Sequence, residues 1–459
     1  MLSPADLVAV HEAALRVLER TGVLVHDDDA VALLRAHGAR ADGRRVFIGE
    51  GAVQAALAAA PSPFILRGRS AARDLQFGTG RPVFASASGP AFVAEGDRLR
   101  PGTLADAEAA VKLGHVSTAI ALHGDCIAPL DLEEGQRTRR GTHARLVLSD
   151  KAVEWVAGTD DDIHLAVAAN EILFGAEWQR EPRALTVLNT TSPLQLSGET
   201  AKILTHWARL RQPACVTACV MGGTTGPATA AGVLVVQHAE VLAALVLVQA
   251  AAEGCPFVYG GLSAMASMRT GAAHFGTADF GWLTEATVQL AKLCGLPVRA
   301  GAAVTDAHAL DAQAALESAL GLLPAVRAGA DFVLQAAGIL SSFNALSFEK
   351  FVVDDAMLDM LCAQAEPAAA DADGLAEDVI DTVGPGGGYL GEAHTRRHAR
   401  DLDRPTFLVR EAFERWRAQG DPDLRAAATR EVARRLESFE PPDDLDPLVR
   451  RQLSMLCLV

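Results

Sequence analysis

Side chains that could bind a ligand or exchange a proton follow several short β-rich segments of this sequence. They are His123, Asn189, Tyr259, Thr305, Asp306 and Gln335. A histidine and a carboxylate can exchange protons, amides orient a ligand through hydrogen bonds, and the face of a tyrosine attracts a cation. Asp306 comes directly after the loop that follows the β-rich segment Val298–Gly301 and is the first candidate for a catalytic group. Each residue also has a structural interpretation, because polar groups at strand ends often satisfy the backbone of the next turn.

Glycine pairs occupy two of the same strand ends. Gly222 and Gly223 follow one β-rich segment, and Gly260 and Gly261 end the next. A glycine allows a sharp turn, and it also lets a large flat ligand approach the backbone closely. Both interpretations stay open at these four positions.

The elements that must position these residues repeat in a regular order. Strand starts are separated by roughly 30 to 41 residues, the length that a strand, a helix and their loops require. The predicted strands are Val83–Phe92, Ile120–Gly124, Val153–Val156, Leu185–Asn189, Val216–Cys219, Phe257–Gly260, Val298–Gly301 and Phe332–Gln335. The predicted helices between and after them are Leu104–Ser117, Glu133–Leu148, Asp162–Phe174, Gly198–Arg211, Ala230–Ala252, Phe280–Cys294, Ala309–Ala328 and Phe348–Ala363.

Eight successive strand–helix units predict a TIM-type (β/α)8 barrel, in which reacting groups lie at the carboxyl ends of the strands. A doubly wound open sheet is the main competitor, but the first strand is not followed by a G-x-G-x-x-G turn. We expect three parts: an N-terminal helical extension over residues 1–80, the barrel over 81–365, and a C-terminal extension over 366–459. The last part contains a glycine-rich loop and terminal helices.

Composition excludes several classes of protein. The chain has 41 basic and 57 acidic residues, a formal net charge of −16, and its basic residues form no stripe, so neither nucleic acid nor an anionic membrane is an expected partner. The N-terminus lacks the pattern of a signal peptide, and the apolar run from Val233 to Ala252 is interrupted by polar residues, so we predict a buried helix there. The seven cysteines are scattered without a C-x-x-C pair. We therefore expect no zinc or other metal site and a cytoplasmic location.

Short strings in order along almost the whole chain resemble the trimethylamine methyltransferase family. Gly295-Leu296-Pro297 is followed by Thr305-Asp306-Ala307 and Asp311-Ala312-Gln313. Further matching strings are Ser192-Pro193-Leu194, Gly226-Pro227-Ala228, Met268-Arg269-Thr270-Gly271, Phe348-Glu349-Lys350 and Gly384 to Leu390. Each string alone is weak, and their order makes the resemblance specific.

The resemblance implies methyl transfer from an N-methylated amine to cobalamin carried on a separate corrinoid protein. Trimethylamine-specific members use pyrrolysine, whose position falls near Val304, and this sequence contains no such residue. The departure points to the branch that resembles glycine betaine methyltransferase. A quaternary amine is already an activated leaving group, so no general acid is needed and the protein has to orient the methyl group and exclude water.

The resemblance also suggests roles for the candidate residues. Aromatic faces at Tyr259, Tyr389 and Phe343 would hold the ammonium group, and Asp306 would supply its counter-charge. His123, Asn189 and Gln335 would bind a betaine carboxylate. Thr305 and the four glycines would line the approach of the cofactor.

Two functions of other classes stay open, as does homo-oligomer formation. The chain could bind a quaternary amine without catalysis, as a sensor or scaffold. It could instead be a barrel enzyme that uses acid–base chemistry, with Asp306 and His123 as the pair and no corrinoid.

Overall fold

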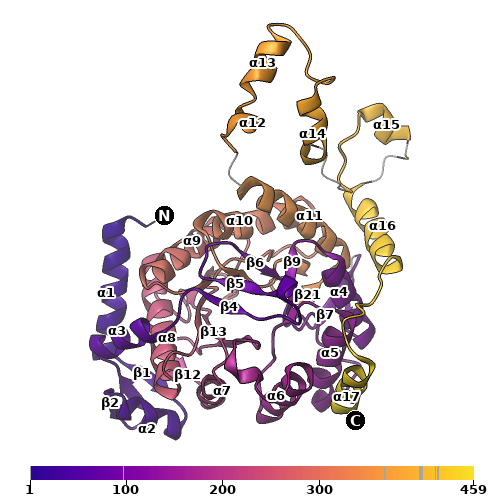
Figure 1. The fold of residues 1–459 in the computed structure, drawn as a ribbon. Helices are drawn as coiled ribbons and strands as arrows, with labels where there is room; N and C mark the ends of the chain where they lie inside the picture. Colours follow the sequence, from indigo (N-terminus) through magenta and orange to yellow (C-terminus); the bar gives the residue numbers. More distant parts are fainter. Residues whose placement is uncertain are drawn as a thin grey trace.

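Eight parallel strands form a closed barrel at the centre of the molecule. The computed structural model describes residues 2–96, 98–365, 369–402, 407–418, 420 and 423–458. The strands pair in the order β10-β9-β6-β19-β18-β15-β13-β11, and a parallel bridge between Glu154 and Leu185 joins the two ends of that order. The predicted (β/α)8 barrel is therefore confirmed (Figure 1). The strands are β6 (Val83–Ala85), β9 (Ile120–His123), β10 (Ala152–Val153), β11 (Thr186–Asn189), β13 (Ala214–Ala218), β15 (Phe257–Gly261), β18 (Val298–Arg299) and β19 (Phe332–Val333).

A helix follows each barrel strand, and together the helices form the outer layer. Thr103 and Thr159 begin α4 and α6 with capping boxes, in which the threonine side chain and an aspartate three residues later satisfy each other's backbone N–H groups. All eight helices predicted for this region are present. They are α4 (Leu104–Val116), α5 (Glu134–Leu148), α6 (Asp160–Phe174), α7 (Gly198–Arg209), α8 (Ala230–Ala251), α9 (Ala278–Leu293), α10 (Ala312–Ala328) and α11 (Phe348–Ala365).

The first barrel strand is shorter than predicted. Residues 83–92 are divided between β6 and β7 (Phe92–Glu95), because the chain turns at Gly89-Pro90. β7 pairs with β8 (Arg98–Pro101) and β21 (Ala345–Leu346), and β21 also pairs with β20 (Ile339–Leu340). A second small sheet joins β14 (Met221–Gly222), β16 (Ala264–Ala266) and β17 (Ala273–His274). Both sheets extend loops that follow barrel strands.

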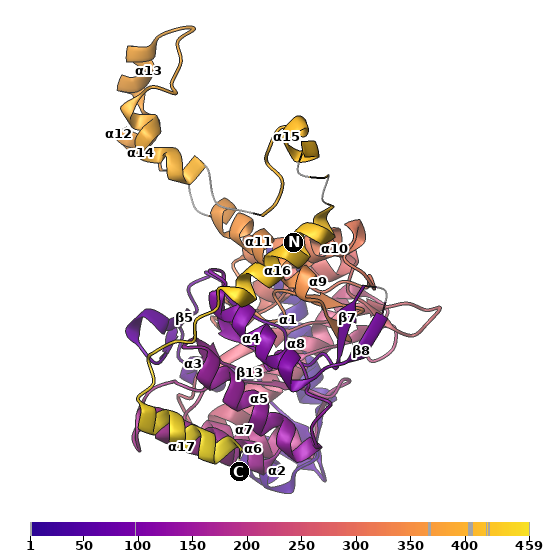
Figure 2. The same cartoon turned by 90° about the vertical axis from the view of Figure 1, so that its right-hand side faces the viewer.

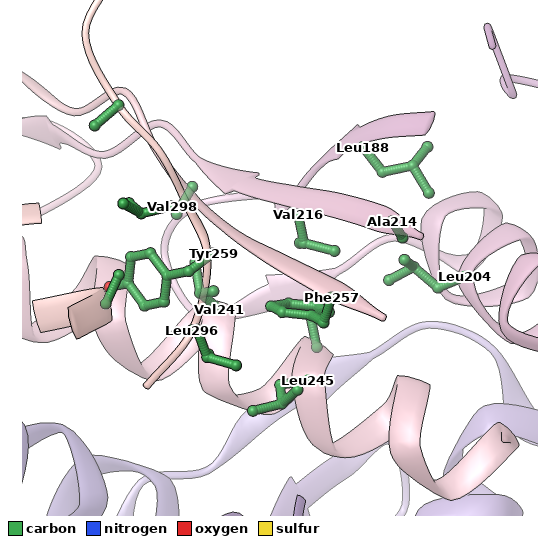
Figure 3. Packing of buried hydrophobic residues seen from close by; sticks show 14 of the residues in the cluster. Leu188, Leu204, Ala214, Val216, Val241, Leu245, Phe257, Tyr259, Leu296 and Val298 are labelled. Atoms are coloured by element: carbon green, nitrogen blue, oxygen red, sulfur yellow. The ribbon is translucent and has the colours of Figure 1, made fainter. Parts of the chain in front are cut away.

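Helix α8 is the most apolar helix among the described residues. It is long and apolar enough to cross a membrane, but 78% of its most apolar window is buried inside the protein. It packs against α1, α7 and strand β13. Figure 3 shows Val241 and Leu245 of α8 against Val216, Phe257 and Tyr259 of the barrel wall. This agrees with the buried helix predicted from its polar interruptions.

The N-terminal residues form helices, as expected for the predicted extension, together with strands that the sequence pattern did not indicate. The helices α1 (Pro4–Arg20), α2 (Asp28–Ala36) and α3 (Glu50–Ala59) lie against α8. A small sheet in the order β12-β1-β3-β2 ties this segment to the barrel, since β12 follows barrel strand β11. Its strands are β1 (Val23–Val25), β2 (Arg40–Asp42), β3 (Arg45–Phe47) and β12 (Gln195–Leu196).

A hairpin closes the amino-terminal end of the barrel. Strands β4 (Phe64–Leu66) and β5 (Leu75–Phe77) place Phe64, Leu66 and Phe77 in one cluster with inward-facing Val258 and Phe332. Figure 1 shows the hairpin across this end. Among the described residues, this end of the interior is thus closed by apolar side chains.

The helices that follow α11 are of two kinds: some lie outside the ring of barrel helices, and others pack on it. The helices α12 (Ala372–Leu375), α13 (Glu377–Val383), α14 (Ala393–Leu402) and α15 (Phe413–Ala418) lie outside the ring of barrel helices in Figures 1 and 2. In contrast, α16 (Leu424–Glu437) packs on α11 and α4, and α17 (Pro447–Leu458) packs on α5 and α6. The three-part division at residues 80 and 365 stays a prediction.

Candidate functional site

Strand alternation decides which side chains face the barrel interior. Successive residues of a strand point to opposite faces. In β13, Val216 and Ala218 belong to the hydrophobic cluster outside the barrel wall, whereas Cys215 belongs to the cluster inside the barrel. The Sγ atom of Cys215 is 3.7 Å from Oγ1 of Thr217. In β15, Val258 is interior, so Gly260 is interior as well. The same rule applied around the barrel defines the site.

The carboxyl end of the interior is polar, in contrast to the apolar amino-terminal end. We call this set the polar layer: Ser88, Asp125, Glu154, Asn189, Thr217, Gly260, Arg299 and Gln335. Five of its members sit on or directly after strands β10, β11, β13, β15 and β18, and the others lie in loops after β6, β9 and β19. The polar layer therefore collects one residue from each of the eight strand–loop units.

Arg299 is the cation of the polar layer. It pairs in register with Gly260 on one side and with interior Phe332 on the other, so its side chain faces inward. The side chain is buried, Nη2 donates to Gln335 Oε1 at 2.6 Å, and Nε has no hydrogen-bond partner among the described residues. Burial lowers the pKa of Arg299, but a guanidinium stays charged in proteins. The site thus contains a buried positive charge with unused donor capacity.

Glu154 is the principal anion of the polar layer. It follows β10, and burial raises the pKa of this carboxyl to about 7, with the nearby charge of Asp125 adding to the effect. A hydrogen bond from Ser88 acts in the opposite direction. Its Oε2 atom is buried and has no partner among the described residues. A nearby cation would favour the ionised form, so Glu154 is suited to face a positively charged ligand.

Small and neutral side chains complete the polar layer. Asn189 is exposed at the mouth of the barrel, and Thr217 is buried below it. A methyl group at Gly260 would lie 2.3 Å from Thr217 Oγ1, so glycine is required where these two strands meet. Gln335 Nε2 donates to the carbonyl of Ser88 at 3.3 Å. Because these side chains are small and neutral, the charged side chains of Arg299 and Glu154 are the main chemical features of the polar layer.

Cysteine chemistry is not favoured at this site. Burial raises the pKa of interior Cys215 to about 12, and it also raises the pKa of Cys219, which follows β13. Both thiols therefore stay protonated near neutral pH and are poor nucleophiles. The arrangement suits binding and orientation of a zwitterion better than nucleophilic catalysis by the protein.

Three residues predicted from the sequence meet in the polar layer. Gln335 and Asn189 were expected to bind a carboxylate, and they lie on the same interior surface as Arg299. Gly260 was expected to line the approach of a cofactor, and it lies beside Thr217. Their chemical roles stay predictions.

Tyr259 does not face the barrel mouth, and its predicted place there is wrong. The residue alternates with interior Val258 and Gly260, so its ring lies between β15 and the surrounding helices, fully buried. Figure 3 shows it beside Val241 on the outer side of the strand. Its hydroxyl oxygen is 3.0 Å from Nδ1 of His238.

His123 is also directed outward, contrary to prediction. The register between β6 and β9 shifts at one position, so that Ile120 and Leu122 face opposite sides and His123 alternates to the outer face. Its ring packs against Gly114 of α4, and Nε2 is 2.8 Å from Ser149 Oγ. Burial, with the charge of Lys151 next, lowers the pKa of His123 well below its ordinary value. The irregular register is the physical reason for the error.

Asp306 connects three loops near the barrel mouth. Its carboxylate accepts hydrogen bonds from the backbone of Phe275 and Gly276 at 3.2 and 3.1 Å, and from Ser342 Oγ at 2.6 Å. Thr305 is fully buried and donates to Glu317 Oε2 at 2.5 Å. These contacts fix loops after β15, β18 and β19 relative to one another. A catalytic role for Asp306 and a cofactor role for Thr305 stay predictions.

Two further predicted residues are aromatic and do not belong to the polar layer. Phe343 packs edge-on against Phe275, with ring centroids 4.8 Å apart. Tyr389 is in the exposed loop between α13 and α14, outside the barrel helices, so it does not line the barrel mouth in this structure (Figure 2).

The remaining predicted glycines serve close packing. A methyl group at Gly222 or Gly223 would meet the side chain of Met265 or Met268 at 2.5 Å, and one at Gly261, on the outer face of β15, would meet buried Gln237 of α8 at 2.6 Å. These neighbours fill the space that a flat ligand would need next to the glycines. The structure therefore favours the packing interpretation of these three positions.

Arg299 and Glu154 were missed by the sequence reasoning, although a signal was present. Each is a charged residue inside a predicted buried strand, Val298–Gly301 and Val153–Val156. Burying an unpaired charge is costly, so such a residue indicates either a salt bridge or a functional site. A charge inside a predicted buried strand is therefore a sequence signal for both Arg299 and Glu154.

Comparison with known proteins shows what this chain is similar to. The sequence model of the family described as trimethylamine methyltransferase (MTTB) matches residues 1–456. A glycine betaine methyltransferase of Desulfitobacterium hafniense is 33% identical over 99% of this chain and 95% of its own length. An L-carnitine:corrinoid methyltransferase of Eubacterium limosum is 28% identical over 95% of this chain and 93% of its own. A crystal structure of the hydroxylamine complex of MtmB has a similar fold, with a TM-score of 0.51 and 10% identity over 96% of this chain and 89% of that one.

Proposed function

This chain belongs to the trimethylamine methyltransferase family, and we propose that it moves a methyl group from a betaine to a corrinoid. A betaine is a quaternary amine that also carries a carboxylate. The methyl acceptor would be cob(I)alamin on a separate corrinoid protein. The names of two similar proteins, the glycine betaine methyltransferase and the L-carnitine:corrinoid methyltransferase, support this choice.

The buried guanidinium of Arg299 is the observation that supports a carboxylate-bearing substrate. Trimethylamine and choline have no group that would use a buried cation, whereas a carboxylate would accept two parallel hydrogen bonds from it. Gln335 holds Nη2 of Arg299 at 2.6 Å and so orients the group before the substrate arrives. Asn189 at the mouth adds a neutral donor.

The ammonium group would lie towards Glu154 and Asp125. Burial raises the pKa of Glu154 most, and the charge of Asp125 raises it further, so these two carboxylates lie on the same part of the polar layer. A cation there relieves that repulsion. The residues of the polar layer include no aromatic ring, so carboxylates take the place of the aromatic faces expected from the sequence.

The protein's part in the reaction is to orient the substrate and to exclude water. With its carboxylate on Arg299, a betaine would be held inside the barrel below the exposed rim residues Gly89 and Asn189. The leaving amine is neutral, so no residue has to donate a proton. When bound, the corrinoid supplies the cobalt that accepts the methyl group.

The rim of the barrel fits the approach of a corrinoid partner. A methyl group built at Gly89 would meet nothing within 4 Å, and Asn189 is exposed beside the polar layer. Met268, at the end of the β16–β17 hairpin, is 71% exposed. These three residues would face the partner, and the closed amino-terminal end of the barrel leaves no other entry to the polar layer. We also propose a cytoplasmic location, without nucleic-acid or membrane partners.

The acid–base alternative requires His123 and Asp306 to act as a pair, and this structure does not bring them together. His123 is buried on the outer face of β9, whereas Asp306 lies in a loop after β18 and is engaged by backbone N–H groups. A protein that only binds a betaine would keep the same polar layer, so activity has to decide between binding and catalysis.

The test is methyl transfer from a panel of amines to reduced cob(I)alamin, followed through the visible spectrum of the corrinoid. Glycine betaine, proline betaine and carnitine carry a carboxylate, whereas choline and trimethylamine are matched substrates without one. We expect transfer from at least one betaine and none from choline. Equal transfer from choline would refute the role of Arg299. Calorimetric binding of a betaine with no transfer, repeated with a cognate corrinoid protein, would instead establish a binding protein.

A further inference from the structure

Three side chains of types that can bind a metal ion come together outside the barrel wall, away from the polar layer. His11 comes from α1, His238 from α8, and Cys294 directly follows α9. Nδ1 of His11 is 2.8 Å from Nε2 of His238, and Sγ of Cys294 is 4.0 Å from each of these nitrogens. The three ligand atoms all lie within 4.8 Å of one another. The fold thus forms a compact group of two imidazoles and a thiol.

The distances are close to those of a tetrahedral zinc site. With Zn–N of about 2.05 Å and Zn–S of about 2.3 Å, tetrahedral geometry requires ligand separations of about 3.3 Å between nitrogens and about 3.6 Å between nitrogen and sulfur. The observed separations differ from these values by roughly 0.5 Å, in opposite directions. Small rotations of the side chains would open the nitrogen pair and draw in the sulfur.

The surroundings of His238 favour a ligand role. Its Nδ1 atom is 3.0 Å from the hydroxyl oxygen of Tyr259, and if Nδ1–H donates there, the lone pair of Nε2 is directed at His11 and Cys294. Metal-bound histidines almost always donate their other N–H in this way.

The group of three ligands is partly open to solvent. The ring of His11 is half-buried. Cys294 is half-buried as well, so water has access to the group and can take a fourth position. Imidazole nitrogen and thiolate sulfur are ligand atoms that zinc favours, and zinc also adopts sites with three protein ligands and a water in the fourth position.

We propose that His11, His238 and Cys294 bind one Zn²⁺ ion, with water as the fourth ligand, and that this ion clamps α1 to the barrel. Binding forms a Zn–S bond and releases the thiol proton to solvent. The ion is structural, because it lies on the outer side of β15, whereas the polar layer lies on the inner side.

The sequence predicted no zinc because its ligands are far apart along the chain. His11 and His238 are separated by 227 residues, and His238 and Cys294 by 56. Only the packing of α1 against α8 and α9 brings them together. The expectation of no metal considered neighbouring residues alone.

A second group provides a control within the same chain. Asp373, His394 and His398 also lie within ligand distance of one another, but on the exposed C-terminal segment. Asp373 is already held by Arg397 at 2.6 Å and by His398 at 2.9 Å. The two groups can be tested separately by mutation.

The experiment measures metal content by mass spectrometry after expression with zinc and extensive desalting. We expect close to one equivalent of zinc in the wild-type chain, and loss of that equivalent in Cys294→Ser and His238→Asn. The matched controls Cys362→Ser and His394→Ala should retain it. A chelator should lower the melting temperature of the wild-type chain and leave that of Cys294→Ser unchanged. Tyr259→Phe should keep the site but weaken zinc affinity roughly 10- to 100-fold.

A second measurement does not depend on variants that must fold. Cobalt(II) added to the metal-free wild-type chain should produce thiolate-to-metal charge-transfer absorption, and zinc should displace it. No retained zinc and no such band would overturn the proposal and leave a hydrogen-bonded histidine pair. Loss of the equivalent in His394→Ala, with Cys294→Ser unaffected, would also overturn it.

Discussion

Replacing Arg299 with methionine tests the assignment of the polar layer most directly. Methionine is similar in length and keeps the apolar stem, but it removes the positive charge and every donor. Arg299 has Gln335 as its hydrogen-bond partner at 2.6 Å, and its Nε has none among the described residues. The change therefore removes substrate contacts while disturbing few contacts within the protein.

The expected loss follows from the bonds that a carboxylate would make. A hydrogen bond between charged groups contributes about 1.5 to 3 kcal/mol, and a guanidinium offers two to one carboxylate. Part of this is offset because the carboxylate also loses its hydration, which leaves about 3 to 4 kcal/mol in total. At 1.4 kcal/mol for each factor of ten, kcat/KM for a betaine should fall by roughly 10² to 10³.

The thermal stability of Arg299→Met should stay unchanged or rise, although its activity falls. Burial disfavours the charge of Arg299 more than the nearby charge of Glu154 favours it, so an apolar side chain at this position removes a net cost of burial. The melting temperature of Arg299→Met should therefore equal or exceed that of the wild-type chain. Thermal unfolding followed by circular dichroism measures this.

The assay is methyl transfer to cob(I)alamin, with glycine betaine and choline compared for each variant. Arg16→Met, on the exposed face of α1, is the control and should match the wild-type chain. Unchanged kcat/KM for betaine in Arg299→Met would refute the reasoning. A loss of activity that accompanies a lower melting temperature would indicate a structural residue instead.

Three further changes have distinct expected outcomes. The pKa of Glu154 is raised from 4.5 to about 7. Between pH 4.5 and pH 7, the carboxyl of Glu154 is therefore ionised in the unfolded chain and protonated in the folded chain. The free energy of unfolding should therefore fall by up to about 3 kcal/mol as pH rises from 4.5 to 7, and urea unfolding of Glu154→Gln should lack that slope. Tyr259→Phe should leave kcat/KM unchanged because the ring faces outward, and it should lower stability by about 1 to 2 kcal/mol because His238 Nδ1 loses its partner. Gly260→Ala should lower both stability, by about 1 to 3 kcal/mol, and activity, because its methyl group would lie 2.3 Å from Thr217 Oγ1.

Each of these has a result that would contradict it. A stability slope in Glu154→Gln equal to that of the wild-type chain would mean that the carboxyl is ionised in the fold. Reduced methyl transfer in Tyr259→Phe would place the ring in the site after all. For Gly260→Ala, the control is Gly51→Ala in α3, where a methyl group meets nothing within 4 Å and should be tolerated. Equal behaviour of the two glycine variants would contradict the steric argument.

Local patterns were sufficient to predict the barrel. The eight strands and eight helices follow from runs of β-branched residues, helix stops and periodic apolar positions, each readable within about a dozen residues. The error in the first strand is local as well, since Gly89-Pro90 divides it. By contrast, the strands β1, β2 and β3 are three residues each, too short to show a period.

The candidate site was predicted in part. The rule that functional groups follow barrel strands led to Asn189 and Gln335, which belong to the polar layer, and Arg299 and Glu154 occupy positions of the same kind. It cannot say which of two successive residues faces inward. Tyr259 and Gly260 are neighbours in the chain, yet one lies behind the wall and the other lines the interior.

The fold class, the order of the elements and the end of the barrel where chemistry belongs can be predicted from the sequence, because they depend on local propensity and spacing. The direction of each side chain depends on the tertiary structure, because one irregular register, as in β9, reverses the alternation for His123. The meeting of distant residues depends on it as well. His11, His238 and Cys294 come together through helix packing, which no pattern of neighbouring residues indicates. Arg299 and Glu154 each stand out as a charge within a buried strand, but closure of the barrel is what brings the two onto one surface.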